Sequence, residues 1–370
     1  MIDNLELIKA TTQVEDPMGG LGIMALAEDG YRVEVLGWDR DGVAVEQCKE
    51  VFASVSDVVN FSFFDAYVEN GIGMRNIDKL IGWIKWVLKA LNRIDNIFAV
   101  HACDLDTGIP ARLFCKKHGV KLVYDIFDYY IDSHFIPSFL SSIVEQIEIQ
   151  VINFADATII CTEERKEQIA KANPKKLVII HNSPELSIMP VEEEIIDYFY
   201  CGVMSDRRLV PEILEEYENN ADLDVLFAGH GPCLDLAVEL AKKYEKLSFI
   251  GSLPYSRVLS IAARARVLSA IYEPNIRNHR LCAPNKFYES LALGKPVIVC
   301  RGTGIDKIVE ENNIGGIIDY DAKQFYDALR KLSLNDNLRR EMGVRARKLY
   351  DEKYNWTIMK SILLEIYNSL

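Results

Sequence analysis

The chain has 370 residues, 49% of them hydrophobic and 26% charged, which is ordinary for a globular protein and long enough for two domains. Its net charge of −13 argues against nucleic acid as a partner, because a phosphate backbone requires clustered Lys and Arg. The cysteines form no Cys-x-x-Cys pair, so neither a zinc site nor a disulfide framework is indicated. No apolar run approaches the ~20 residues that span a bilayer, and the first residues lack a signal-peptide pattern. We therefore expect a soluble, cytoplasmic protein.

Short apolar runs alternate with helical patterns through the first half of the chain. We expect strands at residues 5–10, 32–37, 96–101, 122–125, 157–161 and 176–180, and helices at 21–29, 109–118 and 141–154. Gly30 follows the first helix, as in the helix-to-strand turn of a βαβ unit. Strands that alternate with helices predict a parallel sheet covered on both faces. This pattern assigns residues 1–184 to a first Rossmann-like domain.

The same alternation restarts at residue 196. Residues 185–195 lack clear periodicity, and we interpret them as a linker. Further strands are predicted at 198–202, 225–228, 248–250, 266–270, 296–300 and 316–318, with helices beginning near 211, 234, 255, 285 and 305. The sequence therefore predicts an α/β protein of two doubly wound Rossmann-like domains, the second at residues 196–355, with an interdomain cleft at the carboxyl ends of both sheets. An amphipathic helix at 356–370 ends the chain.

The segment at 283–300 carries the most information on function. Pro284 and Asn285 can start a helix, and a Gly-Lys-Pro sequence stops it before a buried strand. Lys286 and Glu289 are three residues apart, so they share one face near the positive helix N-terminus. Backbone N–H groups and an ammonium suit a phosphate, and a carboxylate can accept two sugar hydroxyls. The arrangement indicates a nucleotide site; the alternative is an exposed helical ion pair.

These residues resemble a known family. The runs 284–289 (Pro-Asn-Lys-Phe-Tyr-Glu) and 293–298 (Leu-Gly-Lys-Pro-Val-Ile) are similar to the donor-binding segment of nucleotide-sugar-dependent glycosyltransferases, family 4 of the GT-B fold. Segments 222–231, 247–253 and 356–367 also appear along the chain in the order expected for that family. The resemblance implies a glycosyltransferase that moves a sugar from a UDP-linked donor to a glycan or lipid-linked acceptor, with retention at the anomeric carbon and without an obligatory metal or cofactor. It also implies bacterial surface-polysaccharide assembly as the setting, and a terminal helix that crosses back to the first domain.

The resemblance also assigns donor-binding roles. Arg207 or Arg208, after the strand at 198–202, would grip the diphosphate, and we favour Arg208; a solvated arginine pair is the alternative. Gly229 and Gly231 would let the backbone approach the nucleotide. The remaining predicted donor-site residues are Gly19 and Gly20 in a loop after the first strand, Ser252, Leu253, Asn285, Lys286 and Glu289.

Two positions depart from the family pattern. The first of two expected glutamates would fall at Leu281, where an aliphatic side chain cannot do the work of a carboxylate; Glu273 is near enough in sequence to be brought in by a different loop path. The histidine that usually contacts the sugar would be at Phe127. These departures keep open a non-catalytic nucleotide-sugar-binding partner subunit, and a nucleotide-sugar epimerase is a further alternative.

Polar residues at two strand ends of the first domain are the candidates for catalysis: His101, Asp104 and Asp128. His101 or Asp104 would orient acceptor or donor, although helix capping or loop hydrogen bonding explains such carboxylates equally well. Asp104 and Asp106 have the spacing of a metal-binding pair but follow an ordinary strand, so we predict no metal site.

The pattern at 77–94 predicts an amphipathic helix. Its polar face carries the cations Lys79, Lys85, Lys89 and Arg93, and Trp86 lies between them on the same face. A tryptophan surrounded by lysines suits a lipid headgroup region, so we predict peripheral membrane contact on the cytoplasmic face. The alternative is an ordinary surface helix.

Overall fold

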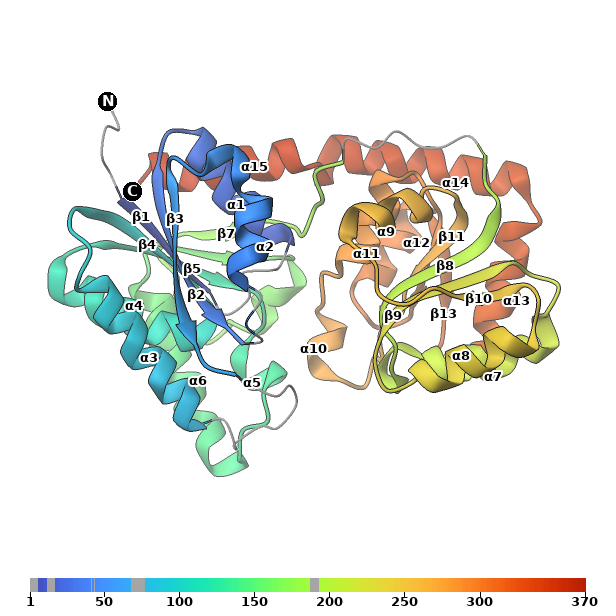
Figure 1. Ribbon diagram of the computed structural model, residues 1–370, viewed down its shortest axis with the longest axis horizontal. Helices are drawn as coiled ribbons and strands as arrows, with labels where there is room; N and C mark the ends of the chain where they lie inside the picture. The colour runs from blue at the N-terminus through green and yellow to red at the C-terminus, as the bar shows by residue number, and fades with distance from the viewer. Residues whose placement is uncertain (1–5, 12–16, 41, 43, 68–76, 187–192) are drawn as a thin grey trace. The chain divides into compact units, whose positions relative to one another are not determined.

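The computed structural model describes residues 6–11, 17–40, 42, 44–67, 77–186 and 193–370 (Figure 1). The chain forms two units, Met1–His181 with Thr357–Leu370, and Asn182–Trp356. Each unit is built on one sheet in which every strand pair is parallel. Two doubly wound α/β units confirm the predicted fold class. Residues 187–192 of the predicted linker lie outside the described residues.

The sheet of the first unit has seven strands in the order β3-β2-β1-β4-β5-β6-β7. They are β1 (Glu6–Thr11), β2 (Arg32–Asp39), β3 (Val59–Asp65), β4 (Ile97–Cys103), β5 (Lys121–Ile126), β6 (Ala157–Ile160) and β7 (Leu177–Ile179). From β1 the chain adds β2 and β3 on one side of the sheet, and from β4 it adds the later strands on the other side, so the strand order reverses between β1 and β4. Ligands of doubly wound folds bind at the carboxyl ends of the strands beside such a reversal.

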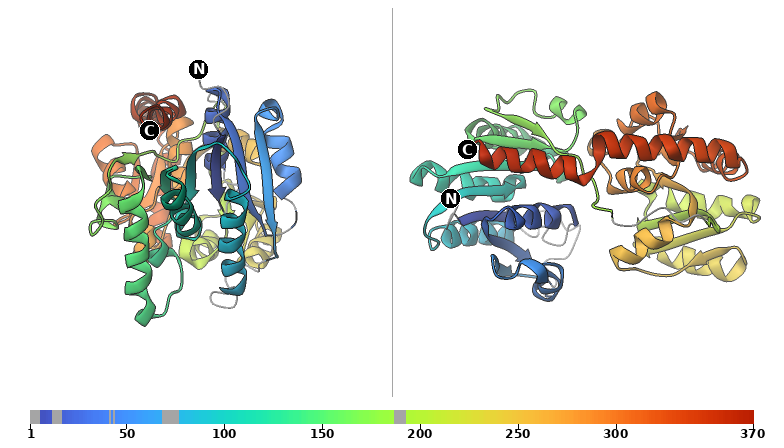
Figure 2. Two further views of the ribbon diagram at one scale, coloured as in Figure 1. Left: turned by 90° about the vertical axis from the view of Figure 1, so that its left-hand side faces the viewer. Right: turned by 90° about the horizontal axis from the view of Figure 1, so that it is seen from above.

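Helices cover both faces of this sheet (Figures 1 and 2). They are α1 (Pro17–Glu28), α2 (Ala44–Val51), α3 (Ile77–Leu91), α4 (Asp104–His118), α5 (Tyr130–Ser133), α6 (Ser138–Phe154) and α15 (Trp356–Asn368), with 3₁₀ turns at Ala53–Val55 and Glu164–Glu167. Right-handed crossovers place α1 and α2 on one face and α3, α4 and α6 on the other. On α3, Trp83, Val87 and Leu91 recur every four residues and are buried against the sheet, each contributing roughly 1.5–3 kcal/mol.

The terminal helix α15 packs on the first unit, as the resemblance implied. Its Tyr367 ring lies 5.9 Å from the ring of Tyr31 at the start of β2. Lys360 forms an ion pair of 2.5 Å with Glu28, the last residue of α1. The helix therefore covers the same face of the sheet as α1.

The second unit has a six-stranded sheet in the order β10-β9-β8-β11-β12-β13. The strands are β8 (Ile196–Val203), β9 (Val225–His230), β10 (Leu247–Phe249), β11 (Ala265–Ala270), β12 (Val297–Cys300) and β13 (Gly315–Ile318). The helices are α7 (Val210–Glu216), α8 (Leu234–Lys243), α9 (Tyr255–Ala262), α10 (Arg277–Arg280), α11 (Asn285–Ala292), α12 (Ile305–Asn312), α13 (Ala322–Ser333) and α14 (Asp336–Leu349), with 3₁₀ turns at Asp206–Arg208 and Tyr217–Asn220 and a π turn at Tyr350–Tyr354. One core lies under α7 and α13, and a smaller one lies under α9 and the end of α11. The strand order reverses between β8 and β11. Because ligands of doubly wound folds bind beside such a reversal, we expect the ligand at the carboxyl end of β8.

Two predicted features of this fold differ from the structure. Helix α4 begins at Asp104, five residues before the expected start, because Pro110 lies inside the helix and is not its first residue. Gly19 and Gly20 lie in the first turn of α1 and not in a loop. A Cβ on Gly20 would make only an ordinary 3.5 Å contact with the Phe52 ring, so the space there does not require glycine.

Trp86 on α3 is half-buried and packs against the core, which corrects the prediction of a fully exposed tryptophan. The Trp86 ring stacks on Trp83 at 5.5 Å and lies 6.0 Å from the ring of Phe64. Lys85 and Lys89 are exposed, whereas the Lys79 ammonium donates to a backbone carbonyl. None of the helices in the described part of the chain is both long and apolar enough to cross a membrane.

Candidate functional site

The carboxyl ends of β8 and β9 approach each other more closely than side chains permit. Gly229 has φ +127°, and a Cβ there would lie 1.9 Å from the carbonyl oxygen of Gly202. Gly231 lies against the backbone of Met204 in the same way, with a Cβ distance of 2.6 Å to the carbonyl oxygen. The predicted glycines are therefore required by the contact between two strand ends. Their packing role accounts for them without a ligand.

Lys286 brings a cation to this edge. Pro284 precedes the first turn of α11, and the side chain of Lys286 reaches back over the end of β8. A Cβ on Gly202 would lie 2.7 Å from Lys286 Nζ, and the amine is 5.5 Å from the centre of the Tyr200 ring. Burial lowers the pKa of Lys286; the carboxylate of Glu289 opposes this shift, and the charge of Arg208 adds to it. An ammonium held near a second cation is a favourable partner for an anion.

Glu289 lies one turn further along α11 and is 8% exposed. Its Oε1 accepts a hydrogen bond of 3.0 Å from the hydroxyl of Tyr255 in α9. Burial raises the pKa of Glu289, while Lys286 and the Tyr255 hydroxyl counteract the rise. Within the described residues, Oε2 accepts no hydrogen bond and remains available to a ligand hydroxyl.

The loop after β8 distinguishes the two arginines. Arg207 is exposed, whereas the Arg208 guanidinium carbon lies 3.7 Å from the centre of the Tyr272 ring. Leu209 follows in the left-handed conformation (φ 58°), and its N–H donates to the Tyr320 hydroxyl at 2.7 Å. A buried leucine in that conformation is strained, so the surrounding contacts fix this loop. Arg208 is therefore the arginine that the structure places with Lys286.

The other residues predicted to bind the donor, Ser252, Leu253 and Asn285, lie near the same strand ends. Gly229 donates its N–H to the carbonyl of Gly251 at 2.8 Å, which brings the loop containing exposed Ser252 and half-buried Leu253 next to the end of β9. Asn285 is the first residue of α11 and is half-buried.

The departures from the family pattern have clear positions. Leu281 is buried directly after α10. Glu273 donates its N–H to the Arg207 carbonyl at 3.2 Å, so its loop lies against the arginine loop.

In the first unit, Asp104 braces the end of β5. Its Oδ1 accepts from the N–H groups of Phe127 (2.9 Å) and Asp128 (3.1 Å). It adopts φ 61°, and burial together with the charge of Asp106 raises the pKa of Asp104 well above its usual range. These contacts describe a residue that holds the loop in shape. Asp106 is also buried; burial raises its pKa to about 6, although the charge of Arg40 counteracts the rise.

His101 is buried and bonded to α15, which argues against its predicted role in catalysis. Val100 and Ala102 belong to the core under α3 and α4, so His101 between them faces α15. The histidine is 1% exposed, with Nδ1 2.5 Å from the Tyr367 hydroxyl and Nε2 3.1 Å from Asp125. Among the described residues, His101, Cys103 and Asp125 form the one group spaced for a metal ion, but both histidine nitrogens already have partners. We therefore assign His101 to the attachment of α15.

Asp128 is the most accessible of the three predicted catalytic residues. Its side chain is 40% exposed and pairs with Arg165 at 3.3 Å, whereas Arg165 is buried. Arg165 also donates to the Phe127 carbonyl. Sequence reasoning missed Arg165, because it lies in a charged run at 163–166 that is typical of a solvated turn.

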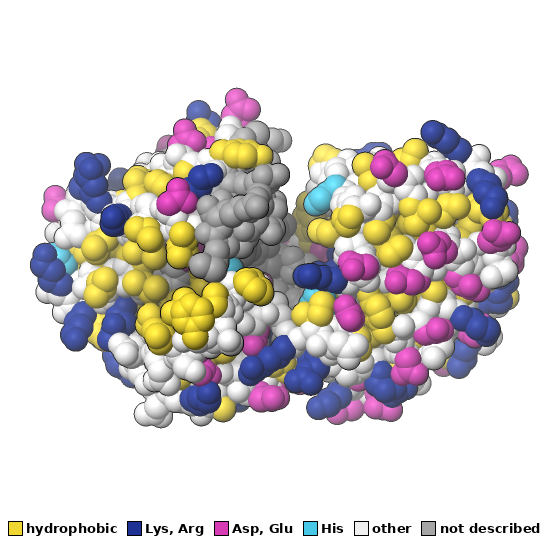
Figure 3. All heavy atoms as spheres, turned by 90° about the horizontal axis from the view of Figure 1, so that it is seen from below, with side chains coloured by type: hydrophobic (Ala, Val, Ile, Leu, Met, Phe, Trp, Pro, Cys, Tyr) yellow, Lys and Arg dark blue, Asp and Glu magenta, His cyan; other side chains and the backbone are white. Residues whose placement is uncertain are grey.

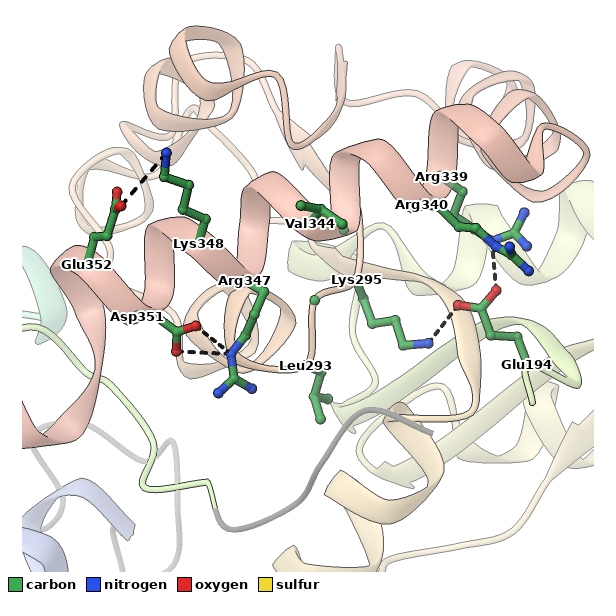
Figure 4. Close-up of a pocket in the computed structure, with 12 residues that line it drawn as sticks. Glu194, Leu293, Lys295, Arg339, Arg340, Val344, Arg347, Lys348, Asp351 and Glu352 are labelled. Carbon is green, nitrogen blue, oxygen red and sulfur yellow. Dashed lines mark hydrogen bonds and ion pairs between the residues drawn. The ribbon is translucent and has the colours of Figure 1, made fainter. Parts of the chain in front are cut away.

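A large hollow in the second unit lies away from these residues (Figure 4). It has a volume of about 1060 Å³ and is lined by α14 and by Gly294 and Lys295, at the opposite end of α11 from Lys286. Glu194 pairs with Lys295 at 2.7 Å and with Arg339 at 2.8 Å, and Asp336 gives Arg339 a second carboxylate partner at 2.8 Å. The two buried cations of this hollow, Lys295 and Arg339, therefore already have carboxylate partners.

The sequence of the second unit matches a family model. Residues 207–335 match the model described as Glycosyl transferases group 1, and this segment contains Arg208, Lys286 and Glu289. Among curated proteins, none matches the chain.

Solved structures share the complete fold. Sucrose-phosphate synthase from Thermosynechococcus elongatus superposes with a TM-score of 0.72 at 14% identity, over 99% of both chains. Anabaena HepE in complex with UDP and glucose gives 0.70 at 14% identity, over 99% of this chain and 100% of HepE. A mutant of S. aureus TarM in complex with fondaparinux, alpha-GlcNAc-glycerol and UDP gives 0.70 at 11% identity, with the same coverage. The comparisons confirm the GT-B fold and support a glycosyltransferase, whereas family 4 stays a prediction.

Proposed function

We propose that the protein transfers a sugar from a UDP-linked donor to a glycan or lipid-linked acceptor, with retention at the anomeric carbon and without an obligatory metal. One observation carries this proposal: Lys286, Arg208 and Glu289 converge at the carboxyl edge of β8, beside the reversal of the second sheet. The complexes of HepE with UDP and glucose and of TarM with UDP support the choice of UDP.

The three side chains have complementary tasks in such a reaction. As the bond between sugar and diphosphate breaks, negative charge grows on the departing diphosphate. Lys286 and Arg208 oppose that charge and therefore stabilise the transition state more than the bound donor. Glu289 Oε2 accepts ribose hydroxyls and orients the nucleoside. Because burial lowers the pKa of Lys286, an anionic ligand favours its protonated form and strengthens its own binding.

Calorimetry with UDP, ADP and GDP tests the proposal directly. We expect UDP to bind and the Lys286→Ala variant to bind it more weakly. Binding of none of the three nucleotides by the wild type would refute the proposal.

Reaction with UDP-sugars separates the alternative functions. UDP release with glycan acceptors, followed by NMR of the anomeric product, tests transfer and retention. Conversion of UDP-GlcNAc without acceptor would indicate an epimerase, and UDP binding without any turnover would indicate a non-catalytic partner subunit.

We also propose peripheral attachment to anionic membranes on the cytoplasmic face. The support comes from the start of α6 and the segment before it. Phe135, which precedes the helix, is 81% exposed, and Phe139 and Ile143 in its first turns are 77% and 56% exposed. The buried residues of α6 begin only at Glu148. Figure 3 shows hydrophobic side chains gathered over the first unit, with Lys and Arg at the margin. Exposed Lys85 and Lys89 of α3 supply cations on the same side of the sheet.

Flotation with vesicles tests the attachment. We expect the wild type to float with phosphatidylcholine–phosphatidylglycerol vesicles and poorly with phosphatidylcholine alone. Phe135→Ser with Phe139→Ser should abolish flotation, whereas Lys85→Glu with Lys89→Glu should reduce only the preference for the anionic vesicles. Equal flotation of all three proteins, or none by the wild type, would refute the attachment.

A further inference from the structure

Arg208 is held by an aromatic ring from the neighbouring strand. Its guanidinium carbon lies 3.7 Å from the centre of the Tyr272 ring, and Tyr272 follows β11, which pairs with β8. This distance is much shorter than the 5.5 Å between Lys286 Nζ and the Tyr200 ring. A guanidinium on an aromatic face is attracted by the negative potential of the ring. The ring therefore restricts a side chain that is otherwise long and flexible.

His279 also restrains Arg208, and the partners of its two ring nitrogens determine which nitrogen donates and which accepts. His279 Nδ1 lies 3.2 Å from the Glu273 carbonyl oxygen, which can only accept, so Nδ1 carries the hydrogen. In the neutral ring Nε2 is then an acceptor, and it lies 3.5 Å from Nη1 of Arg208, which can only donate. The rings of Tyr272 and His279 also meet edge to face at 5.3 Å. Both side chains thus act on the same guanidinium.

The backbones of the two loops are joined as well. The Glu273 N–H donates to the Arg207 carbonyl at 3.2 Å, and the left-handed Leu209 after Arg208 is fixed by the Tyr320 hydroxyl. The Tyr320 hydroxyl in turn donates to the Asp206 carbonyl. The position of the guanidinium relative to the Tyr272 ring is therefore set from both sides.

The restraint opposes a specific repulsion. The charge of Arg208 lowers the pKa of Lys286, which shows that the two cations repel each other. Without a bound anion, a free arginine side chain would turn toward solvent. We infer that Tyr272 and His279 are positioning residues that hold Arg208 beside Lys286, ready to bind the donor diphosphate. This inference rests on the proposed function, because it is the donor that supplies the diphosphate. A held side chain loses less conformational entropy when the donor binds.

The affinities for UDP and UMP, measured by calorimetry, test the inference. The β-phosphate is the part of UDP that UMP lacks, so losing the position of Arg208 should affect UDP most. We expect Tyr272→Leu to weaken UDP binding about tenfold and UMP binding much less, while Tyr272→Phe, which keeps the ring, binds both like the wild type. Arg208→Ala is the reference for complete loss of the guanidinium.

His279 provides a second matched pair. Gln can donate to the Glu273 carbonyl and accept from Arg208, so His279→Gln should retain UDP affinity, and His279→Leu should lower it severalfold. Unchanged UDP affinity in Tyr272→Leu while Arg208→Ala loses it would overturn the inference alone. An equal loss of UDP and UMP affinity would also overturn it, since that result indicates a general structural role. Absence of UDP binding by the wild type would overturn the proposed function and this inference with it.

Discussion

Replacing Glu148 by Gln should make the stability of the first unit less dependent on pH. Glu148 is fully buried in α6, where Oε1 accepts from the Tyr124 hydroxyl at 3.0 Å and Oε2 accepts from the N–H of Tyr130 at 3.3 Å. Burial raises the pKa of Glu148 from 4.5 to about 8, although both hydrogen bonds counteract the rise. The folded protein therefore keeps a proton on this carboxyl at neutral pH.

The direction of the effect follows from proton binding. Between pH 4.5 and about 8 the folded state binds more protons at Glu148 than the unfolded chain does, so the free energy of unfolding falls as pH rises. The contribution is complete below the unfolded pKa and is lost as pH passes the folded pKa. One pH unit corresponds to about 1.4 kcal/mol, which limits the loss between pH 6 and pH 8 to roughly 2.7 kcal/mol. Since the titration levels off near its upper end, we expect about 2 kcal/mol.

The Gln variant removes only the ionisation. Its amide oxygen can accept from the N–H of Tyr130, and its NH₂ group can donate to the Tyr124 oxygen. We therefore expect the stability advantage of the variant over the wild type to grow by about 2 kcal/mol between pH 6 and pH 8.

Urea denaturation at pH 5, 6, 7 and 8, followed by tryptophan fluorescence, measures this difference. Three of the four tryptophans, Trp38, Trp83 and Trp86, belong to the first unit. Glu163→Gln is the control, because it removes the same charge from a surface pair with Lys166. Parallel pH curves for the wild type and Glu148→Gln would show that the carboxyl is not held protonated in the folded state.

Three further predictions concern the site and its supports. Gly229→Ala should destabilise the second unit by about 3 kcal/mol or more in thermal melts, whereas Gly251→Ala, with open space around its Cβ, should cost about 1 kcal/mol; equal costs would contradict the strand-end contact. Glu289→Ala should weaken UDP binding by roughly 1–3 kcal/mol in calorimetry, and unchanged affinity would move the ribose contact elsewhere. Tyr367→Phe removes the hydroxyl beside His101 and should lower stability by about 1 kcal/mol without changing UDP affinity. A loss of UDP affinity in that variant would place His101 in the site after all.

Local patterns predicted most of the fold. Continuous apolar runs revealed the central strands, because a parallel sheet buries them on both faces. Edge strand β3 was not predicted. Val59, Phe61 and Phe63 alternate with polar residues there, but most of the strand is only half-buried, so it lacks the continuous apolar run of the central strands. The start of α4 was misplaced because Pro110 is typical of a first helical turn, whereas here Asp104 begins the helix and its carboxylate binds the next loop.

The site was predictable only where its residues are neighbours in sequence. Lys286 and Glu289 share one helix face, so their spacing indicated a joint role, and the structure places both at the edge of the second sheet. Tyr272 and Arg208 meet across two loops, and no local pattern encodes that contact. The environment of His101 was not predictable for a related reason: its strand end is visible in the sequence, but its burial against Tyr367 depends on a helix more than 250 residues later.

The carboxyl edges of the two sheets differ in the sign of the charged groups that are buried there. In the second unit, Lys286 and Arg208 lie close enough to repel, and the lowered pKa of Lys286 reflects both that repulsion and burial. In the first unit, Asp104 and Asp106 are buried together at the start of α4, and their raised pKa values have burial as the first cause. The first arrangement gains free energy from a bound anion, whereas in the second the Asp104 carboxyl is already used to hold the loop after β5. Under the proposed function, the donor diphosphate is the anion that relieves the repulsion between Lys286 and Arg208, so donor binding and the charge of this edge are linked.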